Sequence, residues 1–522
     1  MHKSKNQKNQ TEISRKLNLL AKSSFIVLVG LIISKVLTYA HRIIIARYFG
    51  AEVYGLFSLA FIIIGFLVAF FSFGLSMGLL RYIPYFRGKN ENNRINNIFR
   101  FSINFSLITS LIAAILLYFS AGFISLNIFN NSGLIIFLKI FSFLIPIYIF
   151  ANIYSSLIRA YEQIGWYSFI TNILSNIVKI IILVIFLILG MKVNSIIFSY
   201  FLGLLSILIM SYIIARYKFS DIFIKDNLDK ITAKNTRKEF FSYSWPLMFW
   251  SSISFIFFWI DSFFIGYMLD ATSVGWYNAA VPIAALMGIA PELFMQLFFP
   301  LITRENSKGN KLVVRELTKQ VGKWIFVLVL PLFLLFYFFP GMFVRLFFGS
   351  EYLSAIAPLK ILSLVAFISA SIVPLSNNLV SMIGKSKLLL ANLVFASLIN
   401  IIFNIILIPK YGINGAAFAT LLSTVLLSIM LLIEVYIFVK MIPFRRKMLQ
   451  IFVLSIIPLS ILIYFKDVMN NSLLGFLLLI FFFILLYTLL IFLTKSLDKH
   501  DFSVLKAIKN KAINIKKITF NE

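Results

Sequence analysis

A few ionisable residues interrupt otherwise apolar segments of this chain, and they are the first places where it could do chemistry. The basic ones are Lys35, Arg42, Lys139 and Lys179, and the acidic ones are Asp261, Glu292 and Glu434. A charged side chain at membrane depth costs about 2.5–3.5 kcal/mol on insertion scales, so it usually faces a water-filled cavity or a partner. These positions are therefore candidates for binding a charged substrate or a coupling ion.

Lys35 and Arg42 are seven residues apart, so on an α-helix they share one face, which Thr38 and Tyr39 flank. This spacing predicts a wet helix face that could bind an anionic group. The alternative is that the two side chains extend along the helix to the membrane surface, which is easier for Arg42 than for Lys35.

Asn172, Ser175, Asn176 and Lys179 follow the spacing i, i+3, i+4, i+7 on a segment that is otherwise rich in Ile, Leu and Val. Such a polar stripe lines water or a polar substrate. The alternative is that its amides and hydroxyls form hydrogen bonds between packed membrane helices.

Asp261 and Glu292 lie in the second half of the chain, whereas most of the embedded basic residues lie in the first half. Two interpretations remain open for these acids. They pair with the basic side chains across a central cleft, which we favour, or one of them binds a coupling proton or cation. Glu434 is expected at the membrane interface.

The composition of the chain is that of a membrane protein. Of 522 residues, 61% are hydrophobic and only 13% are charged, and the mean hydropathy is +0.95. Soluble domains are about half apolar and a quarter charged. The net charge of +29 is typical of loops that face the cytoplasm and anionic lipid, so nucleic acid is not an expected partner. No soluble catalytic domain fits between the apolar segments.

The chain has few of the residue types that bind metals or act as nucleophiles. The chain contains no cysteine and three histidines, of which His2 and His500 lie near the termini. Thiolate metal sites, histidine clusters and a Ser/His/Asp triad are therefore not expected. We expect no cofactor.

About 14 segments are long and apolar enough to cross a bilayer. They are expected at residues 23–45, 54–79, 101–121, 134–155, 166–189, 193–214, 241–268, 274–299, 324–339, 355–375, 388–408, 415–439, 451–464 and 473–493. Most of the 48 Lys and Arg residues fall in the tails and in every second connection, which predicts that both termini lie in the cytoplasm. The fold class is an all-α polytopic membrane protein.

An internal repeat divides the chain. Ala51, Gly55 and Ala60 recur as Ala271, Gly275 and Ala280, a shift of 220 residues. The same shift pairs Asn172 with Asn392. Because the shift spans six segments, the two lobes would share one membrane orientation about an axis along the membrane normal. The expected units are a tail (1–22), a first lobe (23–214), a linker (215–240), a second lobe (241–440), two extra helices (441–494) and a basic cytoplasmic tail (495–522).

Three motifs in order resemble a known family. They are ARYFGAEVYG at 46–55 with Leu80-Arg81-Tyr82 after it, Asp261 with Gly266 and VGWYNAA at 274–280, and PKYGINGAA at 409–417. They resemble Wzx-like polysaccharide flippases of the multidrug/oligosaccharidyl-lipid/polysaccharide exporter superfamily. The resemblance covers most of the chain.

This resemblance implies a two-lobed bundle around a basic central cavity that moves lipid-linked oligosaccharide outward across the cytoplasmic membrane by alternating access. It places Lys35, Arg42 and Lys179 in that cavity and Arg47 and Arg81 near its mouths. Asn172 and Asn176 would contact sugar hydroxyls. The expected partners are the substrate, membrane lipid and, in the cell, other polysaccharide-assembly proteins. The alternatives are an H⁺- or Na⁺-coupled multidrug exporter of the same superfamily and a membrane glycan ligase or polymerase.

Overall fold

The structure is a computed structural model that describes residues 2–224, 228–466 and 473–494. Its described residues are almost entirely helical and contain no β-strand. Helices satisfy every backbone hydrogen bond within one segment, which a bilayer demands because it offers no water. The predicted basic tail at 495–522 lies outside the described residues, whereas the segment 1–22 continues into the first helix.

The first half of the chain forms helices α1 to α8, with a short π-helix after α3 and another between α6 and α7. Their bounds are α1 His2–Phe71, α2 Leu75–Gly88, α3 Asn92–Phe123, η1 Ile124–Ile128, α4 Gly133–Ser142, α5 Leu144–Ala160, α6 Ile164–Ser168, η2 Phe169–Leu174, α7 Ser175–Ile188 and α8 Asn194–Lys218. A 3₁₀ turn, η3 Ser220–Phe223, follows α8.

The second half forms α9 to α19. Their bounds are α9 Lys230–Met268, α10 Ala271–Ala285, η4 Leu286–Gly288, α11 Ile289–Ser307, α12 Lys311–Phe338, α13 Pro340–Phe347, η5 Ser350–Ala355, α14 Ile356–Met382, α15 Ser386–Tyr411, α16 Ile413–Glu434, η6 Val435–Val439, α17 Arg446–Tyr464 and α19 Leu473–Leu493.

Twelve helices of the described part are long and apolar enough to span a membrane, and the bent pair α4 and α5 makes a further span. The first of the twelve, Ile32–Phe71, covers two predicted spans. They are separated at Gly50, whose φ of 79° and ψ of 178° break the helix and favour glycine. The bend of 43° between α4 and α5 is explained by Pro146, which cannot donate to the carbonyl of Ser142.

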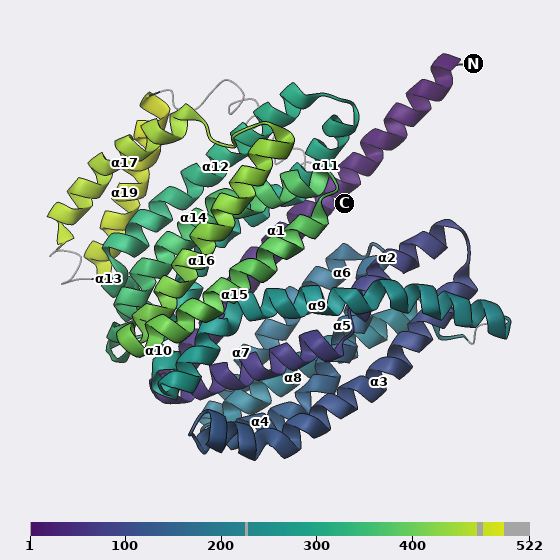
Figure 1. The fold of residues 1–522 in the computed structure, drawn as a ribbon, viewed down its shortest axis with the longest axis horizontal. Helices are drawn as coiled ribbons and strands as arrows, with labels where there is room; N and C mark the ends of the chain where they lie inside the picture. The colour runs from purple at the N-terminus through teal and green to yellow at the C-terminus, as the bar shows by residue number, and fades with distance from the viewer. Residues whose placement is uncertain (1, 225–227, 467–472, 495–522) are drawn as a thin grey trace.

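The helices gather in two lobes (Figure 1). Helices α2 to α8 lie on one side and α10 to α19 on the other, while the long helices α1 and α9 run between them. Helix α1 packs against α10 and α4, and α9 packs against α15 and α2. Helices α17 and α19 pack together beside α12, at the edge of the second lobe. This is the predicted fold: two lobes with two extra C-terminal helices.

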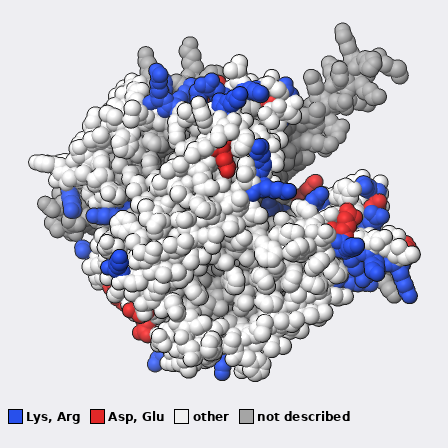
Figure 2. Space-filling view, in the orientation of Figure 1, with Lys and Arg blue, Asp and Glu red and all other residues white. Residues whose placement is uncertain are grey.

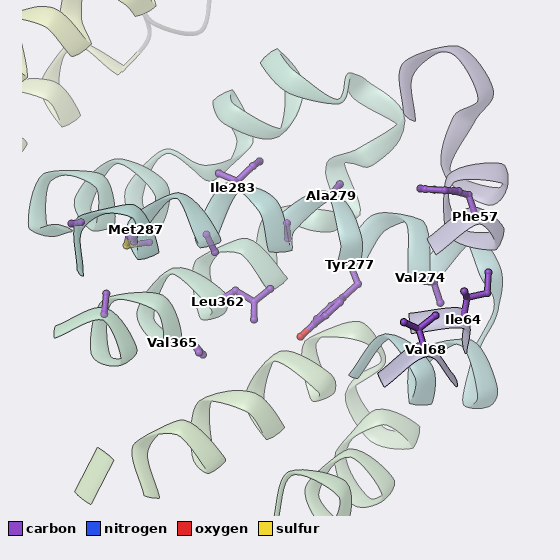
Figure 3. Packing of buried hydrophobic residues seen from close by; sticks show 14 of the residues in the cluster. Phe57, Ile64, Val68, Val274, Tyr277, Ala279, Ile283, Met287, Leu362 and Val365 are labelled. Atoms are coloured by element: carbon purple, nitrogen blue, oxygen red, sulfur yellow. The ribbon is translucent and has the colours of Figure 1, made fainter. Parts of the chain in front are cut away.

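The two lobes meet at a pseudo-symmetric crossing of α1 and α10. A Cβ atom on Gly55 would lie 1.7 Å from the carbonyl oxygen of Ala271, and one on Gly275 would lie 2.0 Å from that of Ala51. The 220-residue shift maps one of these two contacts onto the other, because it relates Gly55 to Gly275 and Ala51 to Ala271. Buried side chains continue this contact, among them Phe57 on α1 and Tyr277 on α10 (Figure 3). Glycine is therefore required where the backbones touch.

Charge is distributed unevenly over the surface. Figure 2 shows Lys and Arg gathered along the upper and right edges, while the body of the molecule is almost free of charge. The connections between α2 and α3 and between α8 and α9 lie toward the right in Figure 1. The uncharged body is what a hydrocarbon environment requires.

Candidate functional site

A small cavity of about 40 Å³ lies between the two lobes. Helix α1 contributes Tyr39, Arg42 and Ile43 to its wall, and α10 contributes Pro282 and Ile283. The other walls come from η4 and the end of α13. Since α1 belongs to the first lobe and α10 and α13 to the second, relative movement of the lobes would change this cavity.

Arg42 is the cationic side chain of the cavity wall. Its guanidinium carbon lies 5.7 Å from the centre of the Trp259 ring on α9. Its Nε is buried and has no hydrogen-bond partner. A buried unpaired donor costs free energy, most of all on a charged group. A ligand oxygen would remove that cost, so Arg42 is poised for an anion.

Lys35 lies seven residues before Arg42 and is paired with an acid. Its Nζ is 3.7 Å from Oε1 of Glu292 on α11, and the side chains are 35% and 46% exposed. The pairing of Glu292 with a base across the lobes therefore occurs here. A pair this exposed is weak, with a typical interaction of about 0–1 kcal/mol, so an incoming phosphate could replace the carboxylate.

Lys179 lies within the first lobe and is not among the residues that line the cavity. Its ammonium group sits 4.7 Å from the centre of the Tyr200 ring, a cation–π distance. Its stem packs where a Cβ on Gly203 would be, with Cγ only 2.3 Å from that position. The structure thus separates Lys179 from the cavity that Arg42 lines.

The polar stripe of α7 and η2 connects to α1. Asn176 accepts a hydrogen bond from Thr38 Oγ1 at 3.3 Å and donates to Ser34 Oγ at 3.2 Å. Asn172 donates to Ser168 Oγ at 3.2 Å. These contacts favour helix packing, the alternative interpretation of the stripe, over sugar binding. The spacing alone could not distinguish them because it does not show that hydroxyls of α1 face it.

Arg47 joins the lobes instead of facing the cavity. Its Nε donates to the Phe347 carbonyl at 2.9 Å and its Nη2 donates to the Leu346 carbonyl. In return Glu351 accepts from the backbone N–H of Ala51 at 2.8 Å. Arg47 of α1 caps the C-terminus of α13, and Glu351 caps the N-terminal end of the second half of α1, after the break at Gly50. We call Arg47, Ala51, Phe347 and Glu351 the capping clasp.

Arg81 lies on α2, away from the cavity, and is exposed. Its guanidinium stacks 4.0 Å from the centre of the Tyr243 ring on α9. It therefore bridges two helices of different halves of the chain at the charged edge of the molecule, and its predicted location near a cavity mouth stays a prediction.

Asp261 of α9 is buried in a cluster of neutral groups from three other helices. Its carboxylate accepts from Tyr277 of α10 at 2.6 Å, from Asn404 of α15 at 2.8 Å, and from Thr420 of α16. Asn404 Oδ1 is buried and has no hydrogen-bond partner. Because the carboxylate is held by neutral donors, the ion-coupling interpretation fits Asp261 better than pairing with a base.

Two sequence patterns could have indicated the polar surroundings of Asp261. Asn400 and Asn404 are one helical turn apart on α15, and Asn400 donates to Thr420 Oγ1 at 3.3 Å. The 220-residue shift also relates Asp261 to His41, which is buried with its Nε2 3.1 Å from Ser199 Oγ. The first lobe therefore holds a polar contact at the position corresponding to the Asp261 cluster.

The fold and cavity define a class, a multi-pass membrane transporter built from two lobes. Residues 20–305 match the family model described as polysaccharide biosynthesis protein, and residues 246–406 match the MatE model. The first match covers more than half of the chain, so the chain belongs to the polysaccharide biosynthesis protein family. This confirms the resemblance seen in the three motifs.

Two curated relatives are similar over most of their length. The chain is 25% identical over 476 residues to the uncharacterized membrane protein MJ1068 of Methanocaldococcus jannaschii, covering 87% of this chain and 92% of that one. It is 24% identical over 402 residues to a putative O-antigen transporter of Shigella flexneri, covering 74% and 90%.

Solved structures share the fold. The lipid II flippase MurJ in an inward closed conformation superposes with a TM-score of 0.70 at 22% identity, covering 90% of this chain and 99% of that one. An inward-facing multidrug resistance MATE transporter gives a TM-score of 0.66 at 16% identity, covering 80% and 99%. The Shigella relative is named a putative transporter, the two solved structures are a flippase and a transporter, and MJ1068 is uncharacterized. The protein is a membrane transporter and not a ligase or polymerase.

Proposed function

We propose that the protein is a flippase that moves a polyprenyl-phosphate- or pyrophosphate-linked oligosaccharide from the cytoplasmic to the outer leaflet of the cell membrane, for surface polysaccharide or glycoprotein assembly. One observation carries the proposal: Arg42 lines the cavity between the lobes, and its buried Nε has no hydrogen-bond partner, although the guanidinium also bonds to Tyr54. A cation in such a place suits a phosphate better than a cationic drug. The O-antigen transporter and the MurJ flippase are similar over most of the chain.

The proposed mechanism is alternating access, in which the cavity opens in turn to the cytoplasmic and to the outer side of the membrane. Arg42 would bind phosphate by charge-assisted hydrogen bonds, which are about twice as strong as neutral ones. Lys35 would leave Glu292 and add a second cation, since their pair is half exposed. In this proposal the termini and the basic connections face the cytoplasm, and the capping clasp closes the outer side.

Asp261 is proposed to couple transport to a monovalent cation or a proton. Its carboxylate and the free Oδ1 of Asn404 are oxygen ligands of the kind that hard cations bind. Among the described residues no group of three or more His, Cys, Asp or Glu could hold a metal ion. That favours a weakly held single charge over a structural divalent ion.

The test is transport of a fluorescent polyprenyl-pyrophosphate-linked sugar in proteoliposomes. Arg42→Gln should lower the initial rate on the order of tenfold, the value of one charge-assisted hydrogen bond. Lys410→Gln is the control, because Lys410 is an exposed cation at the end of α15. An unchanged rate in Arg42→Gln would reject the proposal.

The multidrug exporter alternative predicts a different pattern with the same variants. A proton- or sodium-driven drug pump should stop exporting a cationic dye when Asp261 is changed to Asn, and should be unaffected by Arg42→Gln. Deletion of the gene in its host provides a second measurement. The flippase proposal expects lipid-linked sugar to accumulate on the cytoplasmic side.

A further inference from the structure

A second hollow lies on the outer surface of the first lobe, far from the cavity between the lobes. Its volume is about 480 Å³, and it lies between the end of α3 and α4. Tyr118, Ser132, Ile136, Lys139 and Phe143 are among its lining residues. We call it the α3–α4 groove. Its volume is in the range of small-molecule sites.

The groove combines an apolar floor with one cation. Ile136, Phe143 and Tyr118 are 48%, 59% and 38% exposed, so their side chains face the membrane. Lys139 is exposed as well, and its ammonium group lies 5.5 Å from the centre of the Tyr118 ring. The described residues that line the groove include no acid. A lipid-facing cation without a carboxylate beside it calls for an anionic ligand.

A second polar group points to the same ligand. Ser132 stands at the start of α4 and its hydroxyl makes no capping hydrogen bond to that helix. Lys139 follows six residues after Gly133, about 9 Å along the helix axis. In the orientation proposed above, α4 begins at the outer surface, so Lys139 lies near the boundary between headgroups and hydrocarbon. Phosphate groups of lipids lie at that depth.

We propose that the α3–α4 groove binds an anionic phospholipid of the outer leaflet. Lys139 Nζ and Ser132 Oγ contact the phosphate, and an acyl chain lies along Ile136 and Phe143. The Tyr118 ring, 5.9 Å from that of Phe143, holds the Lys139 side chain toward the headgroup. The leaflet assignment rests on the proposed orientation. The binding itself does not depend on transport.

The experiment uses the full-length protein in nanodiscs that contain photoreactive phosphatidylglycerol or photoreactive phosphatidylcholine. Crosslinks are mapped by mass spectrometry. The phosphatidylglycerol probe should label residues 118–143 on the order of tenfold more than the phosphatidylcholine probe, because phosphatidylglycerol carries a net negative charge whereas the choline cation of phosphatidylcholine offsets its phosphate. Lys139→Gln should abolish that preference, Lys139→Arg should keep most of it, and Ser132→Ala should weaken it a few-fold.

The matched control is Lys360→Gln. Lys360 is also an exposed lysine near the start of a membrane helix, α14, but it does not line the groove. Its replacement should leave the labelling of residues 118–143 unchanged. Equal labelling by the two probes, or a preference that survives Lys139→Gln, would overturn the proposal. Displacement of the phosphatidylglycerol probe by an equimolar polyprenyl phosphate would also overturn it and assign the groove to a carrier lipid.

Discussion

At the scale of single residues, α1 carries the cations Arg42, in the cavity wall, and Lys35, which pairs with an acid outside the residues that line the cavity. Arg42 has a free donor, whereas Lys35 is held 3.7 Å from Glu292. The strength of the contact between Lys35 and Glu292 therefore determines how readily Lys35 can bind a substrate. Lys179 packs on Tyr200 and Gly203, and its place in the substrate path stays a prediction.

Glu292→Gln should increase the affinity for a phosphate-bearing substrate. The amide no longer attracts Lys35, and an exposed pair is worth up to about 1 kcal/mol, so the apparent affinity should rise by at most about fivefold. Substrate titrations of initial transport rate measure it. Glu305→Gln is a suitable control, because Glu305 pairs with Lys308 at the surface. A loss of transport in Glu292→Gln would instead support an acid-dependent exporter.

At the scale of helices, hydropathy was enough to predict almost every span. An apolar run of about 20 residues determines insertion whatever its neighbours are, so the expected segments match the helices of the structure. The functions of Asn176 and Arg47 could not be predicted in the same way. Asn176 bonds to Ser34 and Arg47 bonds to Phe347, and such partners, 142 and 300 residues away, are fixed only by the packed fold.

The crossing of α1 and α10 predicts a stability effect. In Gly55→Ala the new methyl group would lie 1.7 Å from the Ala271 carbonyl oxygen, so the helices must separate. Overpacking of this kind typically costs about 1–3 kcal/mol, and the melting temperature in detergent should fall. Gly122→Ala on α3 should have no such effect, since that position has open space around it. Equal melting temperatures for the two variants would contradict the close crossing.

The capping clasp predicts a conformational effect. Glu351→Ala removes the acceptor of the Ala51 N–H, a bond worth about 0.5–1.5 kcal/mol, and should raise the population open to the outside by about two- to tenfold. Because the chain has no native cysteine, a single Ile283→Cys in the cavity wall reports this opening to an impermeant thiol reagent. Glu52→Ala, which removes a neighbouring exposed acid, should not change the labelling. Slower labelling in Glu351→Ala would show that the clasp does not hold the outer side closed.

At the scale of the whole molecule, two pseudo-symmetric lobes carry different charges. The first contributes Arg42 and His41 near the centre, and the second contributes Asp261 at the position equivalent to His41. One lobe is therefore suited to an anionic substrate and the other to a small cation or proton. The repeat gives the two lobes a similar backbone arrangement. Sequence differences between the repeats give the lobes different charged residues.

This asymmetry predicts that the membrane potential drives export. The fixed charges of the carrier return in each cycle, so the electrical work depends on the substrate and on any coupled ion. A substrate with about two negative charges that moves outward gains roughly 4–5 kcal/mol per 100 mV, inside negative. The export rate in proteoliposomes with a potassium diffusion potential should therefore exceed the rate at zero potential. An Asp261→Asn protein should lose its response to a sodium or proton gradient and keep only the voltage dependence that the charge of the substrate sets, because the coupled ion depends on the carboxylate. A rate independent of voltage in the wild type would reject the proposal that the membrane potential drives export.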